Sequence, residues 1–109
     1  MSSIASVSVD QAGGVTAELI AAITGYRIEV LGFCLAVGGA AVTVKSTLQD
    51  TTANTVRATL VGNATAPVVY SFPGKRENPA WVGALDEGLE LVTGTASAIT
   101  GFIIYRYVK

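Results

Sequence analysis

Oxygen-bearing side chains are the groups in this 109-residue chain that could most readily do chemistry, and they gather in two places. Asp86, Glu87 and Glu90 form the densest group, and Asp50 to Asn54 is a second oxygen-rich stretch. A hard cation such as Ca²⁺ needs several oxygens that converge on one point. Neither segment has the spacing of a known calcium loop, so we expect solvated polar turns and no metal site.

The absence of histidine narrows the catalytic options further. Histidine is the commonest general base and metal ligand, and both Ser-His-Asp and Cys-His catalysis require it. No glycine-rich phosphate loop with its lysine occurs. Two carboxylates could hydrolyse a glycosidic bond, but so small a chain has little material for a deep cleft. We therefore expect a protein that is not an enzyme and binds no cofactor.

Aromatic side chains offer a binding surface of another kind. Tyr26, Tyr70, Tyr105, Tyr107 and Trp81 could line a platform for a sugar. However, Tyr105 and Tyr107 alternate within one expected strand, as packing between neighbouring strands requires. The packing interpretation is favoured for the tyrosines. The only cysteine, Cys34, cannot form a disulfide within the chain, and we expect it to be a buried small apolar residue.

Residues 73–81 interrupt the strand-like pattern of the chain. Lys75, Arg76 and Glu77 stand in a row between two prolines, and the only tryptophan, Trp81, follows them. We expect a protruding loop, and because Trp and Arg are enriched at the energetic centres of interfaces, these four residues are the candidate protein-contact site. The alternative for Trp81 is that it fills the edge of the fold beneath its own loop.

Charge and hydropathy exclude several kinds of partner. Half of the residues are apolar and only 14% are charged, whereas a soluble domain averages about 25%. The net charge of −1 provides no basic field for nucleic acid or acidic lipid. The longest near-apolar run, Val30 to Val44, is glycine-broken and shorter than the roughly 20 residues of a membrane helix. The surplus of apolar residues predicts surface that is covered by neighbouring subunits.

The residue pattern predicts one all-β domain over residues 1–109. Val, Ile and Thr are abundant, and turn signals recur at short intervals, as in a β-sandwich or barrel. Residues 1–12 are expected to be a loose arm or a strand that pairs with a neighbour. The other expected strands are 16–23, 26–37, 41–47, 55–61, 66–72, 89–92 and 98–108.

Three finer predictions concern a bulge, a turn and the position of one strand. In the strand 26–37 the large residues change parity after Gly32, which predicts a β-bulge there or burial of both faces. Residues 85–89 predict a tight hairpin in which Gly88 adopts a positive φ. The strand 98–108 is apolar on both faces, so we expect it to be central in its sheet or covered by another subunit.

Several segments, taken in order, resemble those of a known group of proteins. They are Thr16 to Ala22, Tyr26 to Leu31, Val42 to Ser46, Asn78 to Trp81, Leu85 to Leu91, Ser97-Ala98 and Gly101 to Tyr105. Over residues 16–108 the chain resembles the capsid decoration, or cement, proteins of tailed phages, which have a similar length. Residues 73–77 are more charged here than in that group.

The resemblance implies a jelly-roll-like antiparallel β-sandwich of about eight strands that binds the outside of an assembled capsid and stabilises it without catalysis. The implied partners are the major capsid protein and further copies of the chain, as a dimer or trimer. The implied location is the outer surface of the virion, after synthesis in the cytoplasm of a host bacterium. The alternative is a tail- or fibre-associated, or glycan-binding, β-sandwich module of a phage or bacterium.

Overall fold

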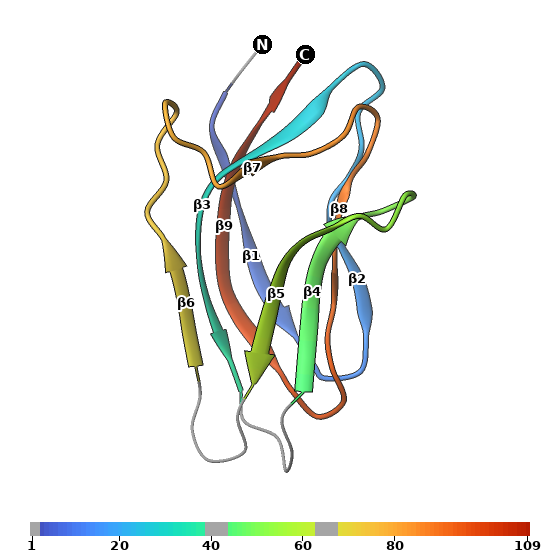
Figure 1. The fold of residues 1–109 in the computed structure, drawn as a ribbon, viewed down its shortest axis with the longest axis vertical. Coiled ribbons are helices and arrows are strands. Elements are labelled where there is room, and N and C mark those ends of the chain that lie inside the picture. Colours follow the sequence, from blue (N-terminus) through green and yellow to red (C-terminus); the bar gives the residue numbers. More distant parts are fainter. Residues whose placement is uncertain (1–2, 39–43, 63–67) are drawn as a thin grey trace.

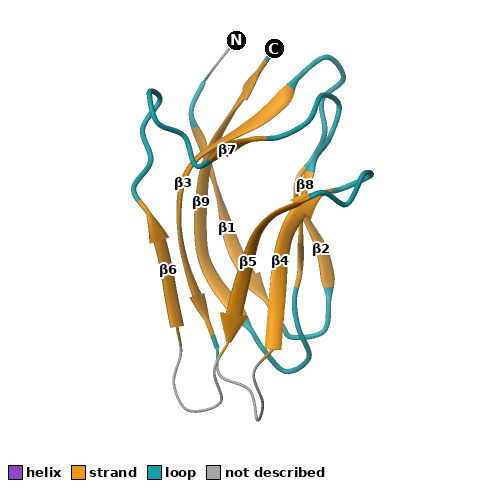
Figure 2. Cartoon of the chain, in the orientation of Figure 1, coloured by secondary structure: helices purple, strands orange, loops and turns teal. Residues whose placement is uncertain are grey.

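The computed structural model describes residues 3–38, 44–62 and 68–109, and within them every regular element is a β-strand (Figure 1). The strands form two layers with loops at both ends (Figure 2). In chain order they are β1 (Ala5–Gln11), β2 (Thr16–Ile20), β3 (Arg27–Val37), β4 (Val44–Asp50), β5 (Val56–Gly62), β6 (Val68–Phe72), β7 (Trp81–Val82), β8 (Leu89–Val92) and β9 (Ile99–Val108).

The strand order identifies the topology as a jelly roll. Sheet A has the order β1-β9-β3-β6, with the short β7 also paired to β3, and sheet B has the order β2-β8-β4-β5. The antiparallel pairs β1·β9, β2·β8, β3·β6 and β4·β5 describe one long hairpin that is rolled into two sheets. The predicted jelly-roll-like antiparallel sandwich of about eight strands is confirmed, and β7 is the additional two-residue strand.

The core lies between the two sheets and follows the period of two that strands impose. Leu35, Ile99 and Ile103 of sheet A and Leu48 and Leu91 of sheet B are completely buried. Burying each such side chain stabilises the fold by about 1.5–3 kcal/mol. The predicted strands therefore correspond to observed ones, although 41–43 and 66–67 lie outside the described residues. Residues 5–11 form strand β1, paired with β9 of the same chain.

A β-bulge interrupts β3 at the predicted place. Val30 is opposite Tyr105 and Gly32 is opposite Ile104, so Leu31 is the extra residue. Beyond the bulge the inward positions change parity, and Leu35 takes the place in the core that Val30 holds before it. The same shift turns Cys34 to the outer face of sheet A, where it is half-buried. The prediction that Cys34 is buried is therefore wrong.

The hairpin predicted at residues 85–89 is also wrong. Strand β8 pairs with β2 and β4, and residues 83–88 carry the chain from sheet A to sheet B. The positive φ belongs to Asp86, at 63°, whose carboxylate accepts a hydrogen bond from the Gly25 N–H at 2.6 Å. Gly88 is required for another reason, because a Cβ there would lie 2.6 Å from the Ile20 carbonyl oxygen.

Strand β9 lies between β1 and β3, as its two apolar faces predict.

Strand β5 is an edge strand of sheet B, and a side chain from sheet A covers part of its free edge. The Tyr70 hydroxyl accepts a hydrogen bond from the Val61 N–H at 2.9 Å and donates one to the Val61 carbonyl at 3.1 Å. This hydroxyl occupies backbone groups that would otherwise face a neighbouring strand.

Candidate functional site

The predicted protruding loop stands out from the edge of sheet A between β6 and β7, at the upper left of Figure 1. The Asn78 N–H donates to the Lys75 carbonyl at 3.0 Å, and the Lys75 N–H donates to the Asn78 carbonyl at 3.4 Å. Arg76 and Glu77 therefore form a two-residue turn. All four side chains are exposed, and we call residues Lys75 to Asn78 the charged hairpin.

The base of the loop is fixed to the bulge in β3. A Cβ on Gly74 would lie 1.3 Å from the Leu31 carbonyl oxygen, so only glycine allows this approach. On the return, the Ala80 N–H donates to the Val30 carbonyl at 2.8 Å, and pairing with β3 resumes at β7. Strand β6 before the loop and strand β7 after it both pair with β3, so the charged hairpin projects from a chain segment that is fixed at its two ends.

Trp81 lies apart from the charged residues that accompany it in the sequence. It is half-buried on β7 and packs against the core. Its ring lies 6.0 Å from that of Phe33, which in turn stacks 6.2 Å from Phe72. The structure brings Lys75, Arg76 and Glu77 together at one exposed tip, whereas Trp81 fills the edge of the sandwich beneath the loop.

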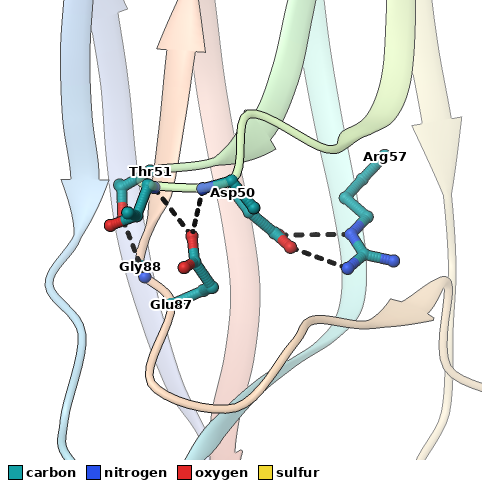
Figure 3. A network of polar contacts seen from close by, with 7 residues as sticks. Asp50, Thr51, Arg57, Glu87 and Gly88 are labelled. Atoms are coloured by element: carbon teal, nitrogen blue, oxygen red, sulfur yellow. Dashed lines mark hydrogen bonds and ion pairs between the residues drawn. The ribbon is translucent and has the colours of Figure 1, made fainter.

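The two oxygen-rich stretches of the sequence, residues 50–54 and 86–90, meet in a polar network (Figure 3). Asp50 accepts hydrogen bonds from Arg57 at 2.7 and 3.2 Å, and Glu87 accepts from the backbone N–H groups of Thr52 and Ala53 at 2.7 and 3.1 Å. The hydrogen bond to Asp50 raises the pKa of Arg57 against the opposing effect of its burial. These carboxylates therefore bind donors of the protein itself.

A second pair of contacts joins the same two segments. The Thr51 N–H donates to the Gly88 carbonyl at 3.2 Å, and the Gly88 N–H donates to the Thr51 hydroxyl at 3.1 Å. Sequence reasoning missed that these segments meet, since nothing in either one specifies the other. Across the described ranges, no three acidic, cysteine or histidine side chains form a group that could hold a metal ion. The network is a structural connection between the β4–β5 turn and the segment that crosses between the sheets.

The tyrosines form no flat platform. Tyr26 and Tyr107 meet edge to face with centroids 6.3 Å apart, as do Tyr105 and Tyr107 at 5.8 Å. The Tyr107 hydroxyl donates to the Ala21 carbonyl at 2.7 Å, and burial raises the pKa of this phenol. A recess of about 290 Å³ lies beside Tyr26, and Lys109 Nζ stands 5.4 Å above the ring of Tyr26. These contacts agree with the packing interpretation.

Comparison of the chain with protein-family models, with curated proteins and with solved structures finds no significant match. Among the described residues there is no helix long and apolar enough to cross a membrane.

Proposed function

We propose that this chain is a capsid decoration protein of a tailed phage, which binds the outside of the assembled shell and stabilises it without catalysis. The supporting observation is the charged hairpin, because it projects from an edge that Gly74 and Ala80 fix to β3. A clamp of this kind needs a stiff scaffold and an exposed contact, and it needs no reactive group. The ordered jelly roll agrees with the fold that the resemblance implies.

The charged hairpin is the proposed contact with the major capsid protein. Lys75 and Arg76 offer cationic donors, and an arginine can bind a carboxylate through two parallel hydrogen bonds. Glu77 beside them supplies an acceptor, so the tip can recognise a surface with both signs of charge. Further copies of the chain are the second proposed partner. The proposed location is the outer surface of the virion, after synthesis in the host bacterium.

Co-sedimentation with capsids tests this function. The protein should sediment with assembled capsids of its phage and leave unassembled capsid subunits in solution. Arg76→Glu should weaken capsid binding by roughly tenfold or more. Lys45→Glu, which makes the same charge change at an exposed position on β4, is the matched control and should bind as the unmodified protein does.

Equal binding to free subunits, or unchanged capsid binding by Arg76→Glu, would contradict the proposed contact. If the protein does not bind capsids but binds immobilised glycans, the result would establish the alternative function, a glycan-binding module of a phage or bacterium.

A further inference from the structure

The outer faces of the two sheets differ in chemistry. The pairing registers place polar side chains along the outer face of sheet B, namely Thr16, Glu18, Lys45, Thr47, Gln49, Thr59 and Glu90. The same reasoning places apolar side chains along the middle of sheet A, namely Cys34, Ala36, Val69, Phe102 and Ile104. We call these five residues the apolar band. The outer face of sheet B is therefore mainly polar, although Val56, Val61 and Val92 also lie on it. On sheet A the apolar band is flanked by Ser8, Ser71 and Thr100.

The apolar band is open to solvent in the single chain. Val69 is 62% exposed and Phe102 is 44% exposed, so both large side chains are available to a partner that covers this face. Beside Phe102 lies a recess of about 250 Å³ that Gly32 and Gly74 help to line. A projecting ring next to a recess gives this face both of the shapes that a self-complementary contact requires.

The charges around the band identify which partner fits. Asp10, opposite Thr100, is exposed at one end of the face, and Arg27, opposite Val108, is exposed at the other. Between them Arg106 is neutralised by its ion pair with Glu29. If a second copy packs on this face with its strands antiparallel, the acidic end of each copy meets the basic end of the other. The net charge of −1 adds little repulsion between copies.

We propose that the outer face of sheet A binds the same face of a second copy across a two-fold axis, with the strands of the two copies antiparallel. Ile104 lies near the axis, since it is midway along β9 between the rows of Thr100 and Val108. Phe102 packs beside it, and Asp10 of each copy lies toward Arg27 of the other. This interface does not depend on the decoration function, and the purified chain alone tests it.

Sedimentation equilibrium of the purified protein measures the association. The unmodified chain should have twice the mass of its 11.2 kDa protomer. Phe102→Arg, and independently Val69→Arg, should weaken the dimer by roughly tenfold or more, because each buries a charge in the band. Thr47→Arg on the outer face of sheet B is the matched control and should remain dimeric. Circular dichroism establishes that each variant is folded.

Charge exchange tests the arrangement of the copies. Arg27→Asp should weaken the dimer, and the double variant Asp10→Arg/Arg27→Asp should restore it, because the two ends again carry opposite charges. A monomeric or three-copy mass for the unmodified chain overturns the proposal. So does a dimer that Phe102→Arg and Val69→Arg leave intact, or a double variant that associates no better than Arg27→Asp alone.

Discussion

Asp50 and Arg57 face each other across the β4–β5 turn, and their side chains are joined by two hydrogen bonds. The carboxylate is nearly inaccessible, since Asp50 is 2% exposed. The guanidinium of Arg57 supplies both donors and therefore satisfies a charge that the core could not otherwise hold. Asp50 is also next to Thr51, which exchanges two hydrogen bonds with Gly88 and so holds residues 83–88, the segment that crosses from sheet A to sheet B.

Removing one partner of this pair should be costly. Arg57→Met should lower the free energy of unfolding by about 3–5 kcal/mol, because the Asp50 carboxylate would stay buried without its counter-ion. The double variant Asp50→Leu/Arg57→Met should recover most of this loss, since neither charge then needs a partner. Urea unfolding of the two variants and the unmodified protein measures the difference. A double variant no more stable than Arg57→Met would contradict this account.

The approach of Gly74 to the bulge in β3 gives a second prediction. Gly74→Ala should lower the free energy of unfolding by about 3 kcal/mol or more, because the added Cβ would overlap the Leu31 carbonyl and force the loop away. Gly14→Asn is the control, because a side chain there meets open space and asparagine tolerates its φ of 74°. Urea unfolding should show a change of less than about 1 kcal/mol for the control.

Much of the fold was predictable from alternation of side chains along the chain. The bulge at Gly32 was predictable because large residues change parity there, and the central position of β9 because both of its faces are apolar. The hairpin at 85–89 failed because a local turn signal fixes a change of direction and leaves the pairing partner open. Strand β8 finds its partners in β2 and β4, which are distant in sequence.

The candidate site was predictable only in part. The run Lys75 to Glu77 between two prolines indicated the loop correctly. Two interpretations of Trp81 were open, a contact residue or a side chain that fills the edge of the sandwich, and its packing against Phe33 and the core favours the second. The junction between Thr51 and residues 83–88 was not predictable, because it depends on how the two sheets are placed.

Tyr107 should make stability depend on pH in alkaline solution. Burial, with smaller effects of Tyr105 and Glu18, raises the pKa of its phenol above the usual value of about 10. The folded protein then binds the phenol proton more tightly than the unfolded chain does. The resulting stability is present in full below pH 10 and is lost as the pH rises through the folded-state pKa. Urea unfolding below and above that pH should show the loss, and Tyr107→Phe should reduce it.

Trp81 and Arg76 should differ in what they do for the fold. Trp81→Ala should lower the free energy of unfolding by about 2–4 kcal/mol, because its half-buried ring packs against Phe33 and the core. Arg76→Ala should change it by less than about 0.5 kcal/mol, since that side chain is exposed at the tip of the charged hairpin. Thermal and urea unfolding measure both. If Trp81→Ala were as stable as the unmodified protein, the packing of Trp81 would not stabilise the fold, and a role as a contact residue would be favoured.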